Sequence, residues 1–155
     1  MSTETRTETA TTAKTRLEPW QAGLVGGLVG GLVFGAMMSM MMPDVIEMGI
    51  PALYGIEGPA GLTGWIIHMS NSAVLGVVFG AIVGASDLSG TGTLAGVGLA
   101  YGIVLWVALA AVVMPVWLSA VGFPMAPPLP NFDPMSMVGH AVYGVVLGAV
   151  YAVVR

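Results

Sequence analysis

The 155-residue chain contains no cysteine and is short of charged residues. Without cysteine it can form no disulfide, no thiolate metal site and no cysteine nucleophile. Only 8% of its residues are charged, against about 25% in a typical soluble domain. Hydrophobic residues make up 56%, so the polar surface is too small to coat a water-soluble globule. We therefore expect the lipid bilayer to surround much of the chain.

The sequence features of several functional classes are also absent. The chain has four Lys and Arg residues in all, too few for a nucleic-acid surface. It contains no phosphate-binding loop, no Ser/His/Asp set and no H-E-x-x-H motif. These absences favour a structural, accessory or binding component over an enzyme.

Four apolar runs interrupt an otherwise polar, Pro/Gly-rich chain. Each has 20 or more residues, enough to cross about 30 Å of hydrocarbon at about 1.5 Å per residue. The runs are Trp20–Met42, Leu62–Ala85, Thr93–Leu118 and Pro134–Val154. The sequence therefore predicts an all-α membrane protein, a bundle of four transmembrane helices spanning residues 19–155. Residues 1–18, rich in Thr and mixed charge, are expected to form a disordered tail.

The charged residues outside the apolar runs predict the orientation of the protein in the membrane. With four spans both termini lie on one side, and that side holds every basic residue: Arg6, Lys14, Arg16 and Arg155. The other side carries only acids: Asp44, Glu47, Glu57 and Asp133. The positive-inside rule places the termini in the cytoplasm. On the outer side, Val45–Tyr54 is expected to form a short helix at the interface.

A shift of 72 residues aligns the two halves without a gap and predicts two tandem two-helix repeats, about 20–85 and 92–155. The Met42-Pro43 pair falls on Met114-Pro115, and the only two histidines, His68 and His140, share the same offset. Units of two spans have the same orientation, so we expect a pseudo-twofold axis along the membrane normal. Both prolines are then expected to end their helices at matching depth.

Small residues recur at every fourth position in the spans. The longest row is Gly23, Gly27, Gly31 and Gly35, and similar rows occur in the other three runs. Such rows let helix backbones approach closely in lipid. They serve either packing within the chain or, on the first helix, a homo-oligomer or a larger membrane complex. The sequence leaves both open.

The two histidines are the only ionisable side chains deep in the expected spans, each about 9 Å below the outer boundary. One interpretation is structural: His68 and His140 bridge the two halves through hydrogen bonds, with Ser39, Ser70, Asn71 and Tyr143 as candidate partners. The second is a b-type cytochrome, because two facing imidazoles are the axial ligands of a bis-histidine haem.

The third interpretation is a copper-binding or transport protein. All eleven methionines after the initiator lie on the outer half of the expected fold. Thioether sulfur and imidazole are ligands that Cu(I) accepts. The candidate metal ligands are His68, His140, Met69, Met41 and Met137. Methionine as flexible apolar filler is the alternative.

The segments MMMPDVIEM, GWIIHM, VVMP and GHAVYGVVLGAVYA together resemble a family of uncharacterised four-span membrane proteins of bacteria and archaea. The resemblance covers about residues 20–155. It implies the four-helix fold and the cell membrane of a prokaryote, and it implies no activity. The acidic joints and the Thr/Glu tail suit a halophilic archaeon.

Overall fold

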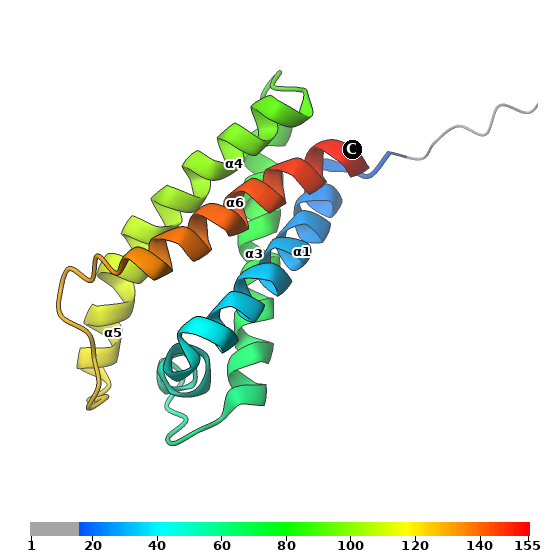
Figure 1. The fold of residues 1–155 in the computed structure, drawn as a ribbon. Helices are drawn as coiled ribbons and strands as arrows, with labels where there is room; N and C mark the ends of the chain where they lie inside the picture. The colour runs from blue at the N-terminus through cyan, green and yellow to red at the C-terminus, as the bar shows by residue number, and fades with distance from the viewer. Residues whose placement is uncertain (1–15) are drawn as a thin grey trace, which may run out of the picture.

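The computed structural model describes residues 16–155, and the expectation of disorder in residues 1–15 lies outside that range. Every element in the described range is helical (Figure 1). The long helices are α1 (Pro19–Met41), α3 (Gly61–Gly84), α4 (Thr91–Leu105) and α6 (Pro134–Val154). The short elements are α2 (Ile50–Ala52), α5 (Met114–Ala120) and two π-helices, η1 (Val45–Gly49) and η2 (Trp106–Val113).

The four apolar helices that the sequence predicts are confirmed as helices long and apolar enough to cross a membrane. Three of them are α1, α3 and α6, and the fourth runs unbroken through α4, η2 and α5 for 30 residues. Both described ends of the chain lie at one end of the bundle (Figure 1). We call this end the terminal side. The opposite end, with residues 43–60 and 121–133, is the loop side.

Helix α1 lies between α3 and α6 and contacts both through glycine (Figure 1). Gly27 lies against the backbone of Ser72 and Gly76 in α3, closer than any side chain would allow. On the adjoining face of α1, Gly30 lies against the carbonyl and ring of Tyr143 in α6. In the described chain the glycine row of α1 therefore serves packing within the chain. A homo-oligomer stays a prediction.

Helices α4 and α6 form a second close pair of the same kind. Gly98 lies against the backbone of Gly144 and Gly148, and Gly102 lies against the carbonyl of His140. Dispersion contact between backbones drives association where lipid supplies no hydrophobic force between helices. The bundle is thus two glycine-packed pairs, α1 with α3 and α4 with α6, joined where α1 meets α6.

The two pairs do not meet symmetrically. A twofold axis along the membrane normal would give α3 and α4 the contact that α1 and α6 have. Helices α3 and α4 instead meet through side chains: the Tyr101 hydroxyl donates to the carbonyl of Leu75 at 2.9 Å. The Phe79 ring lies 5.4 Å from the Tyr101 ring. The expected pseudo-twofold relation is therefore not confirmed.

The expectation that both prolines end their helices is right for Pro43 and wrong for Pro115. Helix α1 ends at Met41, whereas the third long helix passes Pro115 and ends at Ala120. Proline has no backbone N–H, so it leaves the carbonyl four residues earlier without its helical donor. That carbonyl, on Ala111, accepts a hydrogen bond from the backbone N–H of Asn131 at 2.9 Å. The loop therefore satisfies the group that the proline leaves free.

The short helical segment expected after the first span is confirmed as η1 and α2. Ile46 is 2% exposed, and its carbonyl lies against Gly64 at the start of α3. The backbone N–H of Ala60 donates to the carbonyl of Glu47 at 2.8 Å. The segment consequently folds back beneath the bundle and covers its loop side.

Candidate functional site

His68 lies on α3 with its ring turned toward α1. Its Nε2–H donates to the carbonyl of Gly31 at 2.8 Å, and the residue is 7% exposed. This bond joins two helices of the same close pair. Because the carbonyl can only accept, the proton sits on Nε2. In an apolar interior the neutral imidazole is favoured, which leaves a lone pair on Nδ1.

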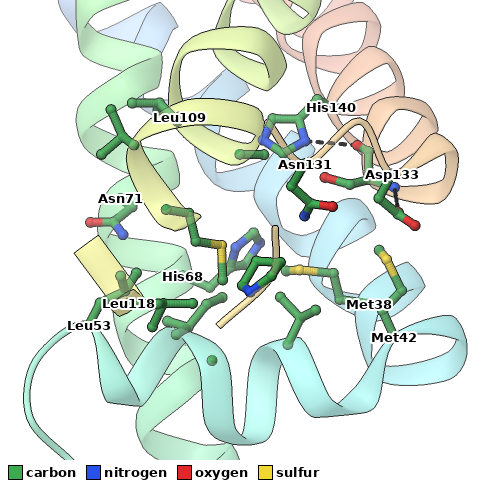
Figure 2. Close-up of a pocket in the computed structure, with 18 of the residues that line it drawn as sticks. Met38, Met42, Leu53, His68, Asn71, Leu109, Leu118, Asn131, Asp133 and His140 are labelled. Atoms are coloured by element: carbon green, nitrogen blue, oxygen red, sulfur yellow. Dashed lines mark hydrogen bonds between the residues drawn. The ribbon is translucent and has the colours of Figure 1, made fainter. Parts of the chain in front are cut away.

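His140 lies on α6 and is held within its own helix. Its Nδ1–H donates to the carbonyl of Ser136 at 2.8 Å, so in the neutral ring the lone pair is on Nε2. The start of α6 is fixed by Asp133, whose carboxylate accepts from the backbone N–H of Ser136 at 2.7 Å (Figure 2). An Asp followed by Pro134 at the first helical position is a standard helix start.

Phe34 on α1 contacts both imidazoles. The centroid of its ring lies 5.5 Å from that of His68 and 4.8 Å from that of His140, in edge-on geometry. Gly139 has no side chain, and the Phe34 ring occupies the space that a Cβ would need. A haem bound by both histidines would therefore have to displace Phe34, and would find Nε2 of His68 already donating to a carbonyl. The haem interpretation stays a prediction.

The hydrogen bonds between the two helix pairs come from tyrosines rather than from the histidines. The Tyr143 hydroxyl on α6 donates to the carbonyl of Ser72 on α3 at 2.8 Å. Tyr101 on α4 makes the corresponding bond to Leu75. None of the four side chains expected as histidine partners bonds to an imidazole among the described residues. Neither histidine therefore bridges the two halves by a hydrogen bond.

A cavity of about 640 Å³ opens beside both histidines on the loop side (Figure 2). This volume is within the range of small-molecule sites. Its wall is mainly apolar and is formed by residues of all the helical elements and of the loop segments. Its polar groups include His68, His140, Asn71, Asn131 and Asp133.

The remaining nitrogen of each histidine has no hydrogen-bond partner in residues 16–155, and both residues line this cavity. Neither Nδ1 of His68 nor Nε2 of His140 makes a hydrogen bond within the described chain. Among the described residues, neither nitrogen is a fully buried polar atom without a hydrogen-bond partner. Each imidazole is thus oriented by a backbone carbonyl on one nitrogen and presents a lone pair on the other. The same arrangement orients histidines that bind metals.

The cavity brings together different methionines from those expected. Met41 is 52% exposed and Met137 is 36% exposed, and neither lines the cavity. Met69 does not line it either. The methionines in its wall are Met38, Met42, Met114 and Met125. The described residues contain no cluster of three or more His, Asp or Glu able to hold a metal. The choice of Met41, Met69 and Met137 as copper ligands stays a prediction.

Sequence reasoning did not select Phe34, Asn131 or Asp133 as parts of a site. Asp133 carried a usable signal, because Asp before Pro134 marks the start of the helix that bears His140. Phe34 carried none, since its role depends on the notch at Gly139 in another helix.

No family model, curated protein or solved structure matches this chain. The resemblance of residues 20–155 to four-span prokaryotic membrane proteins therefore stays a prediction.

Proposed function

We propose that the protein is a binding component of a prokaryotic cell membrane that holds a small molecule in the loop-side cavity. The ligand is an apolar molecule with at least one O–H or N–H donor. The observation that supports this most is the pair of imidazoles, each fixed by a carbonyl and each with a free lone pair beside a cavity of about 640 Å³. Sites for small molecules combine such apolar walls with a few oriented polar groups.

The proposal is for binding without catalysis. It is supported by the two oriented acceptor nitrogens and the amides of Asn71 and Asn131, which suit recognition of a bound molecule.

Binding can be tested with 1-naphthol, a fluorescent aromatic alcohol, added to the full chain in lipid nanodiscs. Energy transfer from tryptophan reports the bound molecule, because Trp117 lines the cavity. We expect saturable quenching, and at least tenfold weaker binding of 1-methoxynaphthalene, which cannot donate.

The matched variants fill the cavity or leave it open. Ala110 lines the cavity, whereas Ala108, on the same π-helix, is exposed and does not. Ala110→Phe should weaken 1-naphthol binding at least tenfold, and Ala108→Phe should leave it within twofold. Equal, non-saturable quenching in all three proteins would mean that naphthol only dissolves in the bilayer, and would refute the proposal.

Cu(I) is a second candidate ligand, favoured by the methionines of the cavity. Met38, Met42 and Met114 line the same space as the two imidazoles, and thioether with imidazole is a soft donor set. An anaerobic Cu(I) titration against a competing chelator tests it. Met38→Leu with Met42→Leu should abolish tight binding, and Met41→Leu, on the exposed face, should not. A visible spectrum of the same preparation tests for haem.

For orientation, we propose that the terminal side faces the cytoplasm. All four basic residues lie at or beyond that side by sequence, and the loop-side segments carry only acidic charge. A cysteine at Glu57 should react with an impermeant maleimide from outside, and one at Asp87 should not. The opposite labelling would reverse the orientation.

We also propose that the chain arose by duplication of a two-helix unit, with one later insertion. Gly27 faces the carbonyl of Ser72 as Gly98 faces that of Gly144. Gly27 and Gly98 are 71 residues apart in the sequence, whereas Ser72 and Gly144 are 72 residues apart. Met42 and Met114 are also 72 apart, so one extra residue lies after Gly98 in the third helix.

The extra residue coincides with η2, and π winding accommodates one more residue per turn than α winding does. Deleting Val107 should therefore give a folded protein with an α-helix in place of η2. Loss of folding on this deletion would count against the insertion.

A further inference from the structure

We propose that the ligand of the loop-side cavity enters from the bilayer, between α3 and η2, and is a tailed hydroquinone or phenol. This inference rests on the proposed binding function. Its ring would lie beside the two imidazoles, and its apolar tail would leave through an opening between Asn71 and Leu109.

The opening follows from how the two helix pairs meet. Near the middle of the bundle α3 and α4 are joined by the hydrogen bond from Tyr101 to Leu75. Asn71, one turn from Leu75 toward the loop side, is exposed, and Leu109 on η2, about two turns from Tyr101 in the same direction, is 37% exposed. Both residues also line the cavity, at one edge of it (Figure 2). The proposed entry lies at this edge of the cavity, between α3 and η2.

The depth of this opening points to lipid rather than water. Asn71 is ten residues into the 24-residue helix α3, or about 15 Å along it. That position is near the middle of a hydrocarbon layer of about 30 Å. The Asn71 amide makes no hydrogen bond among the described residues, and an unsatisfied amide is costly at this depth. A ligand with polar groups would supply its partner.

The polar groups of the cavity select the chemistry of the ligand. His68 and His140 offer acceptor nitrogens, which match donated O–H groups. The cavity wall contains Asp44 and Asp133 and no Lys or Arg, so the anionic headgroup of a phospholipid is disfavoured there. Rings of Phe34 and Trp117 line the same space and suit an aromatic ligand. A neutral, membrane-soluble aromatic alcohol meets all of these conditions.

The route can be closed and reopened reversibly, because the native chain has no cysteine. Cysteines replace Asn71 and Leu109, and a short bis-methanethiosulfonate reagent joins them in nanodiscs. The probes are 2-decyl-1,4-hydroquinone, its dimethyl ether and 1-naphthol. The matched control carries the cysteines at Val74 and Val104, which are 62% exposed and outside the cavity.

We expect cross-linking of Asn71→Cys/Leu109→Cys to slow association of the decyl hydroquinone at least tenfold, and reduction to restore it. The Val74→Cys/Val104→Cys control should change less than twofold. The dimethyl ether should bind the uncross-linked protein at least tenfold more weakly than the hydroquinone.

An unchanged association rate after cross-linking would overturn the bilayer route, and equal binding of the dimethyl ether would overturn the hydroquinone assignment. Saturable 1-naphthol binding in either case would show that the proposed function still stands. Loss of 1-naphthol binding in the wild-type chain would mean that the binding function itself is wrong.

Discussion

Two kinds of glycine contact differ in this bundle: Gly98, toward the terminal side, lets two backbones touch, whereas Gly35 and Gly139, toward the loop side, each make room for an aromatic ring. Gly98 lies against the backbone of Gly144, with no side chain between α4 and α6. Gly35 instead lies against the ring of Trp65, and Gly139 receives the ring of Phe34. The same residue type thus joins helix backbones at Gly98 and seats a ring at Gly139, and the ring seated there, that of Phe34, lines the cavity.

The largest effect is expected from adding a side chain where two backbones touch. Gly98→Val would force its methyl groups into the backbone of Gly144, and we expect a loss of about 3 kcal/mol or more in the free energy of unfolding. Gly96→Val, two residues away, meets only open space and should cost less than about 1 kcal/mol. Reversible unfolding in mixed micelles measures both. Equal effects of the two changes would show that close backbone contact does not stabilise this side.

Removing one large ring from each side should destabilise the terminal side more than the loop side. Phe79 is 1% exposed among close-packed neighbours, and Phe79→Ala should cost about 4 kcal/mol. Phe34 is 7% exposed and borders an existing cavity, so Phe34→Ala should cost less, about 3 kcal/mol. The same unfolding assay checks the order. A larger loss from Phe34→Ala would mean that the loop side is packed as tightly as the terminal side.

The smallest expected effect concerns the hydrogen bonds that join the two helix pairs. Tyr143→Phe removes a donated bond to the carbonyl of Ser72, and we expect a loss of about 1 kcal/mol. Tyr54→Phe is the matched control, because Tyr54 is 59% exposed and its hydroxyl bonds to no described residue. If thermal unfolding finds the two variants equally stable, the tyrosine does not hold the pairs together.

The four spans were predictable because bilayer thickness fixes the length of an apolar helix. The distance of each histidine from the start of its helix was predictable from the same residue count. The continuation of the third helix past Pro115 was not predictable. The freed carbonyl of Ala111 accepts from the backbone N–H of Asn131, which lies sixteen residues after the proline. Which methionine faces the cavity was also beyond the sequence: Met38 and Met42 line it and Met41 does not, a matter of how α1 is rotated against its neighbours.

Both imidazoles line one cavity and each has a nitrogen without a hydrogen-bond partner among the described residues, and nitrogen-15 NMR of the histidine rings can observe these nitrogens. With the full chain in nanodiscs, the account predicts two neutral rings of different tautomers. His68 should carry its proton on Nε2 and His140 on Nδ1, as their carbonyl partners require. Adding 1-naphthol should shift the unprotonated nitrogen of at least one ring. Two rings of the same tautomer, or free nitrogens that do not respond to 1-naphthol, would contradict the account.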